Sequence, residues 1–173
     1  MKMQLREMTE NDLPQVLELQ RELAFQDWNE KQFLSEIHAS YAFCVVCEDE
    51  CGVVDSHGRL LGYAIFHLLG PDSELLSIAT RQSVQRKGIG TLLLNAGLDK
   101  LTERDDQCFL EVRDGNTKAR RFYEKHGFTL YNVRKKYYTD GEDAALYKYS
   151  KAETSSKQNS SAIESSQNGH DKP

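Results

Sequence analysis

A short segment with two glycines is the part of the chain best suited to bind an anion. Residues 85–91 read Gln-Arg-Lys-Gly-Ile-Gly-Thr and follow an apolar run, 75–80, that predicts a buried strand. The apolar residues after them recur at the spacing of an amphipathic helix. The first amides of a helix have no partner within it, and the helix dipole directs its positive end toward them. Strand, glycine loop and helix start in this order predict a phosphate or pyrophosphate site.

The residue types of this loop fit a pyrophosphate. Gly88 and Gly90 have no Cβ, so a phosphate can approach the backbone closely. Arg86 and Lys87 add positive charge at the rim. The P-loop spacing is absent, and Leu93 stands where the dinucleotide-binding motif needs its third glycine. A helix start whose glycines serve only the turn is the alternative interpretation of the motif alone.

Two later residues have the chemistry of proton transfer. Glu111 interrupts an apolar strand expected over 108–112. If it is half buried on the face that carries Phe109, desolvation would raise the pKa of its carboxyl group and make it a base. Tyr123 follows Asn116 by seven residues, which is two turns of a helix and therefore the same face. A phenol there could give its proton to a leaving thiolate. Transfer from a group with a pKa of about 10 to a thiolate with a pKa of about 8.5 is uphill unless it is concerted or the phenol pKa is lowered. The alternatives are a solvent-facing glutamate and a core tyrosine.

Composition bounds the class of protein. The length of 173 residues is enough for one folded domain, expected over 1–150. A balance of 22 Lys+Arg against 27 Asp+Glu argues against direct nucleic-acid binding. No run is long enough to span a membrane, and the first residues lack an apolar signal core, so a cytoplasmic protein is expected. The segment 151–173 has six serines and no aromatic residue, and is expected to be a disordered tail.

The cysteines raise the question of a metal site. Cys44, Cys47 and Cys51 are closely spaced, as in some zinc loops. Cys44 and Cys47 lie in a run typical of a strand, and residues three apart on a strand point to opposite faces. Reduced, structural cysteines and no metal are therefore expected.

The remaining pattern predicts an alternation of strands and helices. Thr9 and Asn29 are placed to cap helices, Asn116 to cap another, and Gly127 to end it. A strand, a helix and a strand in succession imply a parallel crossover. The expected strands cover 5–8, 43–47, 60–69, 75–80, 108–112, 128–134 and 144–149, and the expected helices cover 10–25, 30–39, 90–104 and 117–126.

Taken together, these segments carry a family resemblance. The spacing Gln85-x-x-Gly88-x-Gly90 resembles the coenzyme A loop of the GCN5-related N-acetyltransferases (GNAT). Within that superfamily, residues 3–149 resemble the bacterial ribosomal-protein-alanine N-acetyltransferases (RimI). The segments that carry this second resemblance are Leu110-Glu111-Val112-Arg113, Asn116, Phe122-Tyr123-Glu124 with Gly127-Phe128, Tyr137-Tyr138 and Glu142-Asp143-Ala144.

The resemblance implies a fold, a cosubstrate and residue roles. The fold is α/β, a GNAT acyl-CoA N-acyltransferase fold with a mixed central sheet, splayed parallel strands and flanking helices. The cosubstrate is acetyl-CoA. Glu111 is the implied proton acceptor and Tyr123 the implied proton donor. The implied cofactor-binding residues are Ile78, Ala79 and Thr80 through their backbone, then Arg86, Lys87, Gly88, Ile89, Gly90 and Thr91 at the pyrophosphate, and Asn116.

The resemblance also implies an acceptor, the N-terminal alanine amine of a small-subunit ribosomal protein, attacked directly in a ternary complex. Tyr137 and Tyr138 are expected in a hairpin loop that closes over the peptide, with Glu142 and Asp143 pairing to its basic residues. Trp28 is expected to line the acceptor site or, alternatively, to cover the edge of the core. Transfer to protein lysines or small amines, and a non-catalytic acyl-CoA sensor, are the competing functions.

Overall fold

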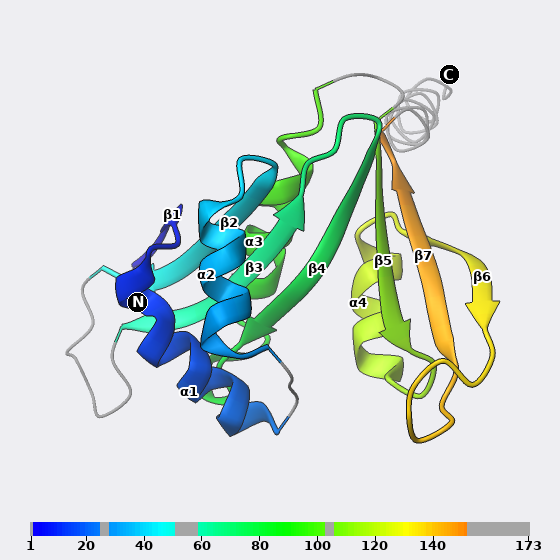
Figure 1. Ribbon diagram of the computed structural model, residues 1–173, viewed down its shortest axis with the longest axis horizontal. Coiled ribbons are helices and arrows are strands. Elements are labelled where there is room, and N and C mark those ends of the chain that lie inside the picture. Colours follow the sequence, from blue (N-terminus) through cyan, green and yellow to red (C-terminus); the bar gives the residue numbers. More distant parts are fainter. Residues whose placement is uncertain (1, 25–27, 51–58, 103–105, 152–173) are drawn as a thin grey trace, which may run out of the picture. The chain divides into compact units, whose positions relative to one another are not determined.

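A computed structural model describes residues 2–24, 28–50, 59–102 and 106–151 (Figure 1). The chain divides into two compact units, which are described separately. Unit 1 comprises residues 1–69 and 73–100, and unit 2 comprises residues 70–72 and 101–173. Cys51, and all but the first residue of the expected tail, lie outside the described residues.

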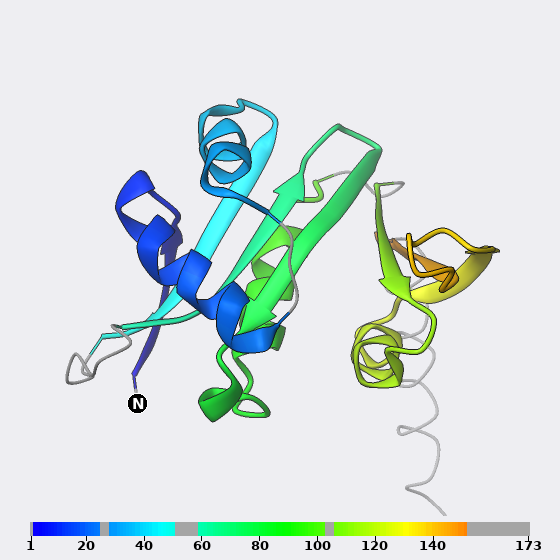
Figure 2. The ribbon, with the colours of Figure 1, turned by 60° about the horizontal axis from the view of Figure 1, so that its bottom comes forward.

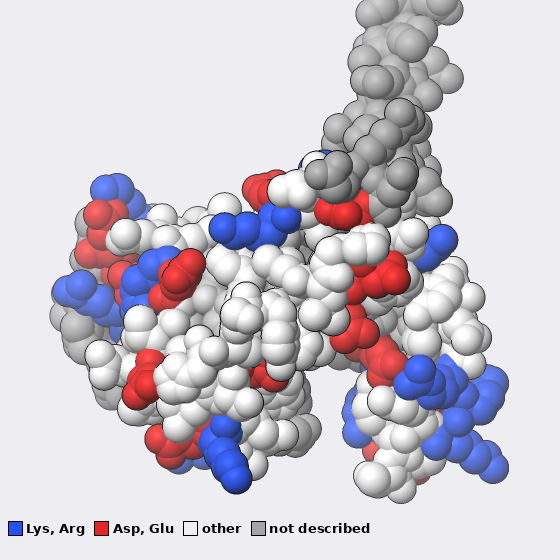
Figure 3. Space-filling model, turned by 45° about the horizontal axis from the view of Figure 1, so that its top comes forward, with Lys and Arg blue, Asp and Glu red and all other residues white. Residues whose placement is uncertain are grey.

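In the part of unit 1 that the structure describes, four strands form an antiparallel array. They are β1 (Met3–Glu7), β2 (Ala42–Asp49), β3 (Leu60–His67) and β4 (Asp72–Thr80), each paired with the next. The side chains of β3 are buried on both faces of the sheet, which explains why its sequence is apolar throughout rather than alternating. On the face shown in Figure 3, acidic and basic side chains are interspersed over this unit. Its ion pairs include Lys2–Glu50 and Arg6–Asp12.

Helices cover both faces of this array (Figure 2). On one face lie α1 (Leu13–Leu23) and α2 (Glu30–His38), and on the other lies α3 (Ile89–Leu98). Gly97 of α3 meets the ring of Phe66, which would lie 2.2 Å from an added Cβ. The core under α1 and α2 consists of Met8, Leu13, Val16, Leu19, Phe33, Cys44, Val46, Leu60, Tyr63, Ile65 and Ala79.

The described residues of unit 2 form three strands and one helix. Strand β7 (Ala144–Ser150) lies between β5 (Gln107–Arg113) and β6 (Thr129–Arg134) and is antiparallel to both. Helix α4 (Thr117–Lys125) carries Tyr123, whose ring packs against Phe128 at 5.7 Å between centroids. The expected antiparallel pairing of the last two strands is confirmed.

The helix ends follow the expected local chemistry. The Asn29 side chain accepts a hydrogen bond from the amide of Gln32, and Gly127 has a left-handed φ of 87° after α4. Helix α3 ends at Leu98, earlier than the expected 104, where the amide of Lys100 turns back to the carbonyl of Gly97 at 3.0 Å. None of the described helices is long and apolar enough to cross a membrane.

The described cysteines lie inside the protein. Cys44, Cys47 and Cys108 are buried and form no disulfide with one another. Burial raises the pKa of the Cys44 thiol to about 12 and that of Cys47 to about 11, so both are protonated at neutral pH. The described part of the chain holds no cluster of three metal-ligating residues.

Candidate active site

The glycine loop of unit 1 lies directly before α3. Gly88 directly precedes the helix with φ 89°, and its carbonyl accepts the amide of Leu92 at 3.0 Å. A Cβ placed on Gly88 would meet no atom within 4 Å, so the space beside its backbone is open. Arg86 and Lys87 are exposed beside it. The helix-start amides, the open backbone and the two cations together fit a pyrophosphate.

The strand that leads into this loop is anchored on β3. Ala79 pairs with Tyr63 and Thr80 with Gly62, and the Ala79 carbonyl would lie 2.6 Å from a Cβ on Gly62. The side-chain amide of Gln85 donates to the Thr80 carbonyl at 3.4 Å. The end of β4, including Ile78, is therefore fixed by the neighbouring strand and by the loop itself.

Glu111 is exposed, so the expectation of a half-buried carboxylate is wrong. Its neighbours Leu110 and Val112 are buried on the opposite face of β5, because successive strand residues alternate. The Glu111 carboxylate accepts a hydrogen bond from Arg134 of β6 at 2.8 Å, in an ion pair open to solvent. The solvent-facing alternative describes this residue, and a basic role requires exchange with Arg134 or transfer through water.

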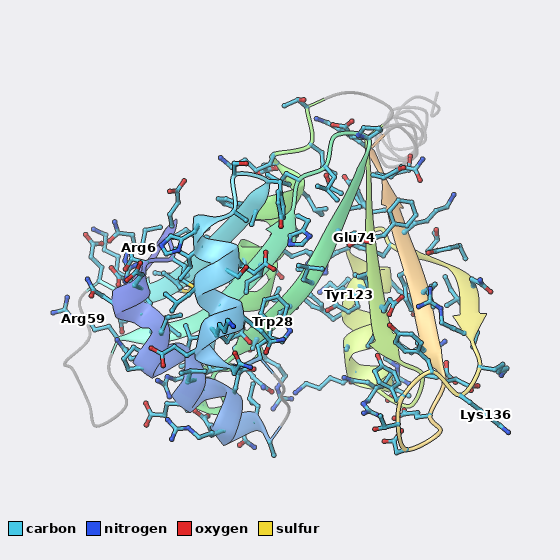
Figure 4. All side chains as sticks on the ribbon, viewed as in Figure 1. Arg6, Trp28, Arg59, Glu74, Tyr123 and Lys136 are labelled. Carbon is cyan, nitrogen blue, oxygen red and sulfur yellow. The ribbon has the colours of Figure 1, made fainter. Side chains whose placement is uncertain are left out.

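Tyr123 is buried in unit 2 with only 8% of its surface exposed (Figure 4). Its ring packs against Phe122 and Phe128. Among the described residues its hydroxyl has no hydrogen-bond partner, and burial raises its pKa above the usual value near 10. A buried polar group without a partner is uncommon and needs an explanation. Tyr123 is therefore protonated at neutral pH, and its hydroxyl donates to no acceptor among the described residues.

Asn116 lies where the sequence predicted, at the start of α4. Its Oδ1 accepts a hydrogen bond from the amide of Ala119 at 3.1 Å, so the predicted cap is confirmed. The oxygen is thereby engaged within the helix. A cofactor contact of this side chain, which stays a prediction, would use its amide N–H groups.

The loop between β6 and β7 is tied to β5 through Arg113. This guanidinium lies 4.0 Å from the ring centroid of Tyr138 and donates to Asp140 at 2.8 Å and to Glu142 at 2.7 Å. Glu142 also accepts the amide of Gly115 at 2.9 Å. Tyr138 is half-buried with its ring against this guanidinium, and its contact with a substrate stays a prediction.

Both acids of this loop, Glu142 and Asp143, already have basic partners within the protein. Glu142 is engaged by Arg113, and Asp143 accepts from Lys135 at 2.7 Å, a contact that holds the pKa of the Asp143 carboxyl below its usual range. The expectation that both acids are available to a substrate is therefore wrong. Tyr137 is exposed, stacks edge-on against Tyr138 at 5.2 Å and remains accessible to a ligand.

Trp28 lies two residues before α2, against the core of unit 1 (Figure 4). Its ring is 5.4 Å from that of Phe33, and its backbone exchanges hydrogen bonds with the side chain of Gln20. These contacts support the interpretation of Trp28 as a cover for the core edge, and its contact with an acceptor stays a prediction.

Arg81 is a buried charged residue that was missed from the sequence. Arg81 directly follows Thr80 and is only 5% exposed, yet its side chain reaches helix α1. The sequence shows only an arginine immediately after an apolar strand. An arginine at such a position is as often exposed to solvent as buried. Its partner Glu22 lies 59 residues earlier and carries no signal that marks the pair.

Comparison with known proteins decides the family. A profile of the Acetyltransferase (GNAT) family matches residues 13–128. The chain belongs to this family. It is 32% identical over 145 residues to an uncharacterized N-acetyltransferase of Methanocaldococcus jannaschii, covering 82% of this chain and 88% of the other. It is 30% identical over 138 residues to the [ribosomal protein bS18]-alanine N-acetyltransferase of Escherichia coli, covering 78% and 88%.

The fold comparison agrees with the family. The crystal structure of the ribosomal-protein-S18-alanine N-acetyltransferase from Escherichia coli superposes with a TM-score of 0.73 at 28% identity, over 86% of this chain and 94% of the other. The protein is thus a GNAT-type N-acetyltransferase with the expected α/β fold, and the resemblance to RimI is confirmed at the level of homology.

Proposed function

We propose that this GNAT protein acetylates the N-terminal alanine amine of a small-subunit ribosomal protein, with acetyl-CoA as the donor. The observation that carries the catalytic part is Tyr123, a buried phenol that has no hydrogen-bond partner among the described residues. The acceptor class is supported by similarity to enzymes that act on bS18, which extends over most of both chains.

The residues of the loop fit the proposed donor. The open space at Gly88 admits a phosphate beside the backbone, where a side chain would fill it. The segment Arg86, Lys87, Gly88, Ile89, Gly90 and Thr91 would hold the pyrophosphate. Ile78, Ala79 and Thr80 would bind the acetyl-pantetheine arm through their backbone, and Asn116 would add a side-chain contact. When bound, acetyl-CoA supplies an acetyl group activated as a thioester.

The protein then has three tasks during transfer. A free α-amine has a pKa of about 7.7–8.0, so much of it is already neutral near pH 7. Glu111 accepts the proton that the amine loses as the C–N bond forms, and its exposure favours transfer through water. A backbone amide near Ala79 or Thr80 polarises the acetyl carbonyl. Tyr123 gives its proton to the sulfur as the C–S bond breaks.

The pH profile should separate these roles. We expect kcat/KM for a peptide acceptor to rise with an apparent pKa of about 7.7–8.0, because only the neutral amine attacks. No fall is expected below about pH 10, because burial raises the pKa of Tyr123 above its ordinary value. Glu111→Gln should lower the plateau by about tenfold without moving the rise, as expected for a base that assists a largely neutral amine. A descending limb between pH 8 and 10 would contradict the assignment of Tyr123.

The acceptor is tested by thiol release from acetyl-CoA with three acceptors. These are a peptide that begins with alanine, the same peptide with a blocked α-amine and an added lysine, and a polyamine. Release only with the open alanine terminus is the expected result. Release with the blocked peptide or the polyamine would move the activity to lysine or small-amine acetylation. No release with any acceptor, despite tight cofactor binding, would favour a non-catalytic sensor.

A further inference from the structure

A buried arginine joins the segment that leads into the glycine loop to helix α1. The Arg81 side chain donates from Nε to the carbonyl of Leu60 at 2.7 Å. Its Nη1 donates to Glu22 at 3.1 Å, and its Nη2 contacts Glu18 at 3.5 Å. The Arg81 amide also donates to the carbonyl of Leu61 at 2.9 Å. Backbone and side chain of this one residue are therefore held by β3 and α1 together.

Glu22 completes the attachment by bonding the next residue along. Its second carboxylate oxygen accepts the backbone amide of Gln82 at 2.9 Å. Gln82 opens the short 3-10 turn Gln82–Val84, whose last amide donates to the Arg81 carbonyl at 3.1 Å. We call Arg81, Glu22 and the Gln82 amide the loop clasp. It fixes the direction in which the chain leaves β4.

Beyond the clasp, the backbone adopts left-handed conformations that need support from the surrounding structure. Arg86 has φ 62°, an uncommon value for a residue with a side chain, and Gly88 has φ 89°. Left-handed residues outside glycine cost free energy and persist where the surroundings determine them. Helix α3 holds the far end of the loop, and the clasp holds the near end. The strained segment lies between these two attachments.

We propose that the loop clasp preorganises the pyrophosphate site, so that Arg81 and Glu22 are positioning residues for cofactor binding. Both act through the loop backbone, and the ordering that they impose is completed before the ligand arrives. The inference deepens the proposed function and rests on its assignment of residues 86–91 to the pyrophosphate. It predicts that losing the clasp weakens binding of the phosphate part of the ligand and leaves the pantetheine part unaffected.

The test uses Glu22→Ala and Glu22→Gln in the full chain. Hydrogen exchange of the ligand-free protein should show faster exchange of amides 82–91 in Glu22→Ala. Calorimetry should show its Kd for coenzyme A raised by about tenfold, as for the loss of a charge-assisted contact. kcat/KM with acetyl-pantetheine, which has no pyrophosphate, should be unchanged. Glu22→Gln keeps an acceptor for the Gln82 amide and should give intermediate values.

A matched control is Glu48→Gln, which weakens the ion pair of Arg6 with Glu48 at 2.9 Å in the same unit. It should leave the affinity for coenzyme A unchanged at a similar cost in melting temperature. If Glu22→Ala binds coenzyme A and exchanges amides 82–91 as the wild-type protein does, the proposal of the loop clasp is overturned and the proposed function is not. Equal losses with coenzyme A and acetyl-pantetheine would also overturn it, because they indicate a general structural effect. A wild-type protein that binds no coenzyme A would overturn the proposed function together with this inference.

Discussion

Replacing Tyr123 with Phe is expected to lower kcat by at least about 100-fold, the usual minimum for loss of a general acid. The substitution leaves the ring, and therefore its packing against Phe122 and Phe128, in place. It removes a buried hydroxyl that has no partner among the described residues. Burying such a group costs about 1–3 kcal/mol, so its removal should leave the folded protein as stable as before or more stable.

The substitution is expected to lower kcat but not to lower stability, and this combination distinguishes a catalytic role from a structural one. Thermal unfolding and calorimetry with coenzyme A should show a melting temperature and a Kd at least as favourable as those of the wild-type protein. Tyr149→Phe is the matched control, because Tyr149 also packs on Phe128, at 5.5 Å, in the same unit. It should retain full kcat. A Tyr123→Phe variant with unchanged kcat would refute the proton-donor role, and one that unfolds would show that the hydroxyl serves the fold.

Features governed by neighbouring residues were predictable from the sequence. Hydrophobic periodicity located the helices and strands, because each element must bury one face or both. Asn29 and Asn116 cap the helices that follow them, since an amide oxygen three residues before an orphan amide is within reach. The glycine loop was located in the same way, because its residues and the helix that it opens are adjacent in the chain.

Features governed by distant residues were not predictable. The exposure of Glu111 and its pairing with Arg134 depend on the order of β5, β7 and β6. The acids at 142 and 143 looked available because nothing in the sequence marks Arg113 and Lys135 as their partners. A single sequence gives the charge of each residue but not the register that brings two of them together. The strands, helices and loop that carry the candidate site could therefore be predicted from the sequence. The pairing of its charged side chains could not.

Replacing Gly88 with Ala should raise the Kd for acetyl-CoA by roughly 100-fold, or about 2.7 kcal/mol. The added Cβ would occupy space that is open beside the backbone, where the proposed pyrophosphate approaches. It would also stand on a residue with φ 89°, which disfavours any side chain. The loss of affinity therefore has two sources, the blocked approach and the strain in the loop.

Gly70→Ala is the control for the stability cost of placing alanine in a left-handed conformation. Gly70 has φ 81°, and a Cβ there would also meet no atom within 4 Å, so the backbone strain and the steric freedom match those of Gly88. Both variants should lose about 1 kcal/mol of stability from the left-handed conformation, measured by denaturant unfolding. Only Gly88→Ala should lose affinity for the cofactor. Equal affinity in the two variants would mean that the phosphate does not approach the backbone at Gly88, and the loop would then be only the start of a helix.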